Sequence, residues 1–106
     1  MSDVILPEAL VFEWDSGNST KSWLKHKISI EEAEEVFYDA KRLLLEDIRH
    51  SKLEKRFIIY GKTKEEKRLF IVFTLRARDI EKIRIISARV MKRKERDMYE
   101  KAINSA

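Results

Sequence analysis

Four runs of apolar residues follow one another from residue 43 onward, and polar or charged connections separate them. The runs are rich in β-branched and aromatic residues, which is typical of strands. The connections are short, and short connections join neighbouring antiparallel strands. The pattern therefore predicts a four-stranded antiparallel meander formed by residues 43–48, 56–61, 68–75 and 82–90.

The chain before the meander has a helical pattern. Ser29 and Glu32 have the spacing of a capping box, and the apolar residues that follow them fall on one helical face. A shorter helix is expected from about Ser19 to Lys25, after the turn-forming residues 15–19, with Trp23 and Leu24 facing inward.

Both ends of the chain give weaker signals. Residues 1–9 are expected to be a frayed N-terminal segment, and residues 10–14 a short strand. After residue 90 the charges follow a helical period around Met91, Met98, Tyr99 and Ala102, which predicts an amphipathic C-terminal helix. The expected fold class is α+β: a short N-terminal strand and two helices packed on a curved meander, with a C-terminal helix.

The predicted strands are apolar at both odd and even positions, although antiparallel strands commonly leave one face to water. The helices cover one face of such a sheet. The other face must be covered by the terminal helix, by the curvature of the sheet, or by another chain. At 106 residues the chain is expected to form one domain, residues 1–106.

The distribution of charge along the chain points to a function. Of all residues 40% are charged and the net charge is +4, but residues 1–50 carry a net −5 and residues 51–106 a net +9. A concentration of positive charge is typical of a surface that binds phosphate. The alternative is a solvated face of ion pairs.

Several function classes are disfavoured. The chain has no cysteine and two separated histidines, His26 and His50, so neither a metal site nor another cofactor is expected. No apolar run approaches the roughly 18 residues of a membrane span, and no leader pattern is present. We therefore expect a cytoplasmic protein without a membrane partner.

Arginines of the predicted sheet are the main candidates for phosphate binding, because the guanidinium group grips phosphate in a bidentate manner. Arg84 and Arg89 are an odd number of residues apart, so strict alternation puts them on opposite faces. They share a site only if a bulge lies around Ser87 and Ala88. Each arginine has the alternative role of an ion-pair partner or a charge at a sheet edge.

The remaining candidates are weaker. Lys25 and His26 combine a phosphate-polarising cation with an imidazole, or else form a helix end that the dipole stabilises. Glu54 and Arg56 are a candidate base with its cation, or a structural pair. Tyr99 is expected in the core, with its hydroxyl at the rim.

An ordered set of short motifs resembles the BrnT family, although none of them is specific alone. The resemblance covers about residues 11–100. It rests on Phe12-Glu13-Trp14-Asp15, Lys25-His26, Ile28-Ser29, Glu32-Ala33, Val36-Phe37, Glu46-Asp47, Arg49-His50-Ser51, Glu54, Arg56, residues 83–89, Glu95-Arg96 and Tyr99-Glu100.

The resemblance implies a RelE-like fold and the toxin of a type II toxin–antitoxin system: a metal-independent endoribonuclease that inhibits translation. It also implies a DNA-binding BrnA-like antitoxin of the ribbon-helix-helix type, a heterotetrameric complex, and contact with DNA through the antitoxin alone. The alternative is a basic module that binds RNA or a partner without catalysis.

Family position and residue type together give each candidate a role. Arg84, Arg89 and Lys25 are expected to stabilise charge, with Arg56 in support, and His26 or Glu54 to transfer protons. RNA contacts are expected from Arg78, Lys92, Arg93 and Tyr99.

Four positions depart from the family pattern. Asn18 stands where the family usually has lysine, and Ser22 where it has asparagine. Lys27 replaces the glycine that gives a left-handed helix end. Lys92 replaces the threonine that completes a capping box with Glu95.

Overall fold

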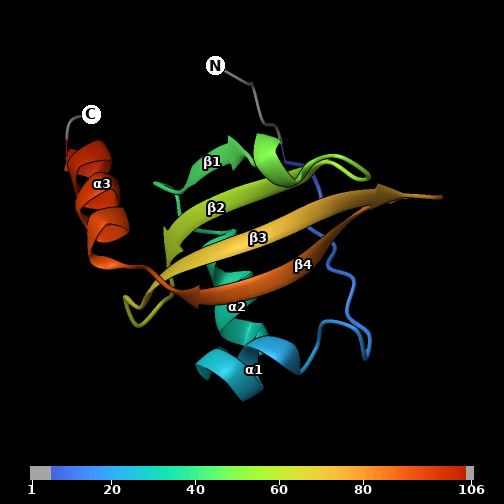
Figure 1. Cartoon of the computed structure of the whole chain (residues 1–106), viewed down its shortest axis with the longest axis horizontal. Coiled ribbons are helices and arrows are strands. Elements are labelled where there is room, and N and C mark those ends of the chain that lie inside the picture. The colour runs from blue at the N-terminus through green and yellow to red at the C-terminus, as the bar shows by residue number, and fades with distance from the viewer. Residues whose placement is uncertain (1–5, 105–106) are drawn as a thin grey trace.

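The computed structural model describes residues 6–104, and Figure 1 shows a single twisted sheet with one helix behind it, one beside its β4 edge and one at its end. The elements are α1 (Lys21–His26), α2 (Ile30–Val36), β1 (Leu43–Glu46), a 3-10 turn η1 (Ile48–His50), β2 (Arg56–Lys62), β3 (Arg68–Ala77), β4 (Glu81–Val90) and α3 (Arg93–Asn104). None of the helices in this part of the chain has the length and apolar character needed to cross a bilayer.

The predicted meander is confirmed. All neighbouring strands are antiparallel, and their order in the sheet is β1-β2-β3-β4. The strand bounds lie within two residues of the prediction, because turn residues interrupt each apolar run where the strand ends. The α+β class and the C-terminal helix are confirmed as well.

A bulge interrupts the pairing of β3 with β4. Val72 pairs with Ser87, but Phe73 pairs with Ile85, so Ile86 is an extra residue on β4. The bulge reverses the alternation of side chains beyond it. It lies one residue before the predicted position, and it brings Arg84 and Arg89 to the same face of the sheet.

Helix α2 covers one face of the sheet and encloses the main core with it, whereas α1 lies beside the edge strand β4 (Figure 1). The predicted capping box starts α2: the Ser29 hydroxyl accepts the Glu32 N–H, and the Glu32 carboxylate accepts the Ser29 N–H. Val36 and Phe37, which follow on the inner face of this helix, are fully buried. The helix is held by the burial of this apolar face.

The outer edge of β4 is covered by residues 11–22, and this corrects the predicted N-terminal strand. Phe12 forms one isolated parallel bridge with Ile83. Beyond that bridge, side chains replace the backbone ladder: the Asn18 amide donates to the Ile85 carbonyl at 2.9 Å, and the Ser22 hydroxyl accepts the Ala88 N–H at 2.9 Å. Residues 16–20 form turns, so no strand continues along β4.

The N-terminal residues that the structure describes, 6–10, form no helix or strand, but Leu6 and Leu10 pack against the core. The rest of the predicted frayed segment, residues 1–5, lies outside the described residues. The inward position predicted for Trp23 is wrong, because its neighbour Ser22 faces β4 and Trp23 is 50% exposed. The predicted side-chain position of Leu24 also falls outside the described part.

Helix α3 covers one end of the second face of the sheet (Figure 1). Tyr99 of α3 is fully buried in a small cluster with Tyr60 and Met91. The rest of the second face, on which the side chains of Leu45, Arg56 and Ser87 lie, has none of the described helices over it. We call this surface the open face.

Candidate functional site

A row of polar residues crosses the open face from β1 to β4. Arg56 pairs with Thr74, and Thr74 pairs with Arg84. Asp47 extends the row past the end of β1, because its N–H donates to the Arg56 carbonyl at 2.8 Å. These four residues, Asp47, Arg56, Thr74 and Arg84, are called the polar row.

His50 joins the polar row through Asp47. Its Nδ1 lies 3.0 and 3.2 Å from the two carboxylate oxygens of Asp47. The imidazole is 64% exposed, whereas the carboxylate is 13% exposed. An acid that binds one ring nitrogen orients the imidazole and leaves the other nitrogen for proton transfer.

Ser51 links the loop that carries Asp47 and His50 to the start of β2. Its hydroxyl donates to the Asp47 carbonyl at 2.6 Å and accepts the Arg56 N–H at 3.0 Å. Two hydrogen bonds from one hydroxyl close the loop that carries His50. The positions of His50 and Arg56 are therefore coupled.

Arg56 forms no ion pair with any residue that the structure describes. Its backbone is held on one side by Ser51, and the Lys55 carbonyl next to it accepts the Thr74 hydroxyl at 2.7 Å. The Arg56 side chain lines a groove together with Arg49, His50, Lys52, Leu53 and Glu54. A guanidinium group in such a place is suited to an incoming anion.

Arg84, at the other end of the row, is already paired. Its guanidinium contacts both oxygens of Asp15, at 2.8 and 3.0 Å, and Glu13 at 3.2 Å. The hydrogen bond to Asp15 raises the pKa of Arg84, and the same bond lowers the pKa of Asp15. A side chain on Gly17 would start 3.0 Å from the Arg84 guanidinium, so the turn fits closely around it.

A chain of ion pairs extends this end of the site toward the hairpin that joins β3 to β4. Arg76 binds Glu13 and Glu54, each at 3.3 Å. Glu54 therefore pairs with Arg76, and the predicted pairing with Arg56 is not observed. Arg78, in the hairpin, is exposed.

Arg89 lies on the same face as Arg84 but two cross-strand rows away. Their partners on β3, Phe70 and Thr74, are four residues apart, which corresponds to about 13 Å along a strand. Both guanidinium nitrogens of Arg89 bind Glu95, at 2.8 and 3.0 Å, and the group stacks over Phe70. These hydrogen bonds lower the pKa of Glu95.

Lys25 and His26 lie at a third place. Both are exposed in the last turn of α1, one turn after Ser22, which contacts β4 at Ala88. They are thus at the outer edge of β4, on the far side of that strand from Arg56. The candidates predicted from sequence divide into the polar row with Glu54, the Arg89 end, and the end of α1.

The prediction that Tyr99 contacts RNA is contradicted by its burial. Tyr99 is 0% exposed, and its hydroxyl donates to Asp39 at 2.6 Å. Burial and the bond to Asp39 raise the pKa of Tyr99, so the hydroxyl stays protonated. Lys92 and Arg93 are exposed at the start of α3, where the Lys92 N–H donates to Glu95 at 2.7 Å.

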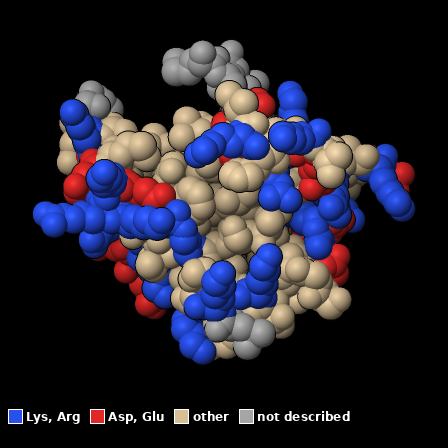
Figure 2. Space-filling model, viewed as in Figure 1, with Lys and Arg blue, Asp and Glu red and all other residues tan. Residues whose placement is uncertain are grey.

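Acidic residues of the first half of the chain form ion pairs with basic residues of the second half. For this reason the positive charge of residues 51–106 does not appear undiminished on the surface. Glu13 and Asp15 neutralise Arg84, and Glu32 binds Lys67 at 2.8 Å. Lysines and arginines still surround the open face, whose centre is uncharged (Figure 2). Positive charge is therefore a property of the rim of this face.

The arrangement is suited to acid–base chemistry at a phosphate. It combines an oriented imidazole, an unpaired arginine and a second arginine in one row. No group of three or more residues of the types His, Cys, Asp and Glu could hold a metal ion within residues 6–104.

Neither His50 nor Asp47 is among the candidate site residues that the sequence predicts. The signal was present, because Asp47 and His50 have the i, i+3 spacing that meets on a single helical turn. What was missing was the turn itself, since the polar connection gave no helical pattern.

Comparison with protein families gives a match over most of the chain. Residues 14–95 match the model described as "Ribonuclease toxin, BrnT, of type II toxin-antitoxin system". The matched range includes α1, α2, the whole sheet and all of the polar row. Comparison with curated proteins gives no match.

Proposed function

This chain belongs to the BrnT family of ribonuclease toxins of type II toxin–antitoxin systems, and we propose that it is a metal-independent endoribonuclease that acts through the polar row and His50. The observation that carries the proposal is the pair formed by His50 and Asp47 next to the unpaired Arg56. RNA cleavage without a metal requires a group that takes the 2′-hydroxyl proton and cations that hold the phosphate. His50 is proposed as the base, and Arg56 and Arg84 of the polar row as the cations.

In the proposed reaction His50 takes the proton of the 2′-hydroxyl through the ring nitrogen that does not face Asp47. The 2′ oxygen attacks phosphorus, the bond to the 5′ oxygen breaks, and the leaving oxygen takes a proton from water. Arg56 holds the phosphate oxygens as negative charge accumulates on them, and Arg84 supports it. The products are a 2′,3′-cyclic phosphate and a 5′-hydroxyl end.

The other candidates extend the RNA path. Arg89 and the exposed Lys92 and Arg93 extend the proposed path toward α3, and Lys25 and His26 extend it along α1. Glu54 is proposed to position Arg76. Arg78, in the hairpin that joins β3 to β4, is proposed to contact the RNA strand. Lysines and arginines that follow a backbone bind RNA without reading its sequence.

The family assignment supports a wider biological role. We propose that cleavage inhibits translation in the cytoplasm, and that the fold is RelE-like. The antitoxin is proposed to be a BrnA-like ribbon-helix-helix protein that forms a heterotetramer with the toxin and alone contacts DNA.

Incubation of the purified protein with RNA in excess chelator tests the proposal. We expect cleavage with cyclic phosphate ends, and a loss of about 100-fold for Arg56→Ala, since removal of an electrostatic clamp costs about 3 kcal/mol. A shift of RNA mobility without cleavage supports the second candidate, a non-catalytic binding module. The ion pairs that occupy Arg84 and Arg89 favour that candidate.

A further inference from the structure

Large aliphatic side chains are exposed beside the polar row. Leu45 on the open face is 46% exposed, Ile48 in η1 is 78% exposed, and Leu53 in the connection to β2 is 103% exposed. All three belong to a stretch of nine residues that also carries His50. We call Leu45, Ile48 and Leu53 the aliphatic patch.

Nothing within residues 6–104 covers the patch. Helix α2 packs on the opposite face of the sheet, α1 lies at the β4 edge, and α3 covers the row that contains Tyr60 and Phe70 (Figure 1). All three residues lie in β1 or in the connection from β1 to β2, and exposed apolar surface of this kind is typical of a protein interaction site.

Cations surround the patch and have no acidic partners. Arg49, Lys52, Lys55 and Arg56 form no ion pair within the described chain, whereas the acids Asp47 and Glu54 are bound to His50 and Arg76. In Figure 2 lysines and arginines border the uncharged centre of this face. A partner that fits the patch therefore presents apolar side chains flanked by acidic ones.

RNA fits the patch less well. Bases bind by stacking on aromatic rings or arginine planes, but the aromatic residues of this face, Tyr60 and Phe70, pack in the cluster beneath α3. A second copy of this chain fits poorly too, because it would bring the same unpaired cations into contact with themselves.

We propose that the aliphatic patch is the docking site of an acidic, amphipathic segment of the antitoxin, an inference that rests on the proposed toxin function. Docking there covers the groove lined by His50 and Arg56. The antitoxin then neutralises the toxin by covering the entrance of the toxin's active site.

The test uses the full chain and, as the probe, the protein encoded by the adjacent open reading frame. The double variant Ile48→Glu/Leu53→Glu places acids opposite the acidic segment, and Ile48→Ser/Leu53→Ser removes the apolar anchors alone. The control is Tyr38→Glu/Ile80→Glu, which alters residues that are 66% and 54% exposed away from the patch. Antitoxin affinity and RNA cleavage are measured for each.

We expect the glutamate pair to weaken antitoxin binding about 100-fold and the serine pair about tenfold, with the antitoxin affinity of the control pair within about twofold of wild type. Unchanged antitoxin affinity in both pairs overturns the inference. Loss of RNA affinity with unchanged antitoxin affinity also overturns it and assigns the patch to RNA. If the wild-type protein does not cleave RNA, the proposed function fails, while the change in antitoxin affinity still decides this inference.

Discussion

The carboxylate of Asp15 grips the guanidinium group of Arg84 with both oxygens, at 2.8 and 3.0 Å, across 69 residues of sequence. A carboxylate and a phosphate bind the arginine fork in the same bidentate way. In the free protein, Asp15 therefore occupies the position that the proposed RNA phosphate takes on Arg84.

Replacement of Asp15 by Asn is expected to tighten RNA binding. Each additional phosphate contact to single-stranded RNA changes the salt slope by about 0.7, which is about fivefold in affinity at 0.1 M salt. Affinity for a non-cleavable 2′-O-methyl RNA, measured over a range of salt concentrations, checks this. Asp79→Asn, in the exposed hairpin, is the control, and an equal change in both variants contradicts a specific competition at Arg84.

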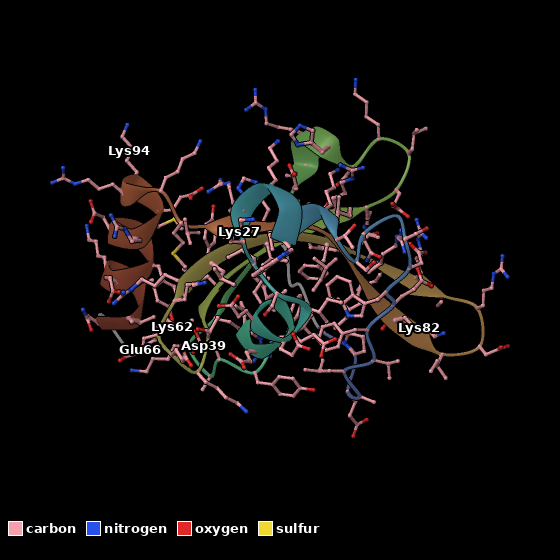
Figure 3. The ribbon with its side chains drawn as sticks, turned by 90° about the horizontal axis from the view of Figure 1, so that it is seen from below. Lys27, Asp39, Lys62, Glu66, Lys82 and Lys94 are labelled. Atoms are coloured by element: carbon pink, nitrogen blue, oxygen red, sulfur yellow. The ribbon has the colours of Figure 1, made fainter. Side chains whose placement is uncertain are left out.

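Tyr99→Phe is expected to destabilise the protein by about 1–2 kcal/mol without affecting RNA cleavage, because the lost hydroxyl binds a carboxylate in the core. Asp39 retains the N–H donors of Lys62 and Lys41, at 2.9 and 3.0 Å (Figure 3). Urea unfolding and a cleavage assay measure the two effects. A variant of normal stability with impaired cleavage would restore the role in RNA binding.

The same contact predicts how stability depends on pH. Burial raises the pKa of Asp39, but the hydrogen bonds from Tyr99 and two N–H groups outweigh it, so the folded-state pKa lies below the ordinary 3.8. The stabilisation is therefore complete above pH 3.8 and is lost as the pH falls through the lower folded-state value. The difference in stability between wild type and Tyr99→Phe should shrink in acid, and a constant difference contradicts this assignment.

Lys27→Gly is expected to stabilise the protein by about 0.5–1 kcal/mol. Lys27 ends α1 in the left-handed region, at φ 59° and ψ 37°, where glycine has no steric cost. Glu66, at φ 65°, should respond in the same direction (Figure 3). Lys94→Gly in α3 is the matched control and should cost about 1 kcal/mol, so a similar loss at position 27 contradicts the argument.

The sequence was informative about structure wherever the signal was local. Apolar runs predicted the four strands, and the spacing of Ser29 and Glu32 predicted the capping box. The prediction of an N-terminal strand was wrong because its pairing depends on which backbone hydrogen-bonding groups of β4 are left without a partner. That dependence cannot be read from residues 10–14.

The candidate site was predicted less well because it depends on register and long-range pairing. Arg56 and Arg84 share a row only through their common partner Thr74. The acids that bind Arg84 come from the opposite end of the chain, so sequence patterns gave no reason to pair them. The contact between His50 and Asp47 was not predicted, because the turn that brings them together forms inside a polar connection.

The most direct test of the account compares the single-turnover rates of RNA cleavage by His50→Asn and His26→Asn in excess chelator. We expect His50→Asn to lose about 100-fold or more, as removal of a general base requires, and His26→Asn to lose less than about tenfold. Unfolding curves show that both variants are folded. Full activity of His50→Asn together with loss of cleavage in His26→Asn would place the active site at the end of α1 and contradict the assignment to the polar row.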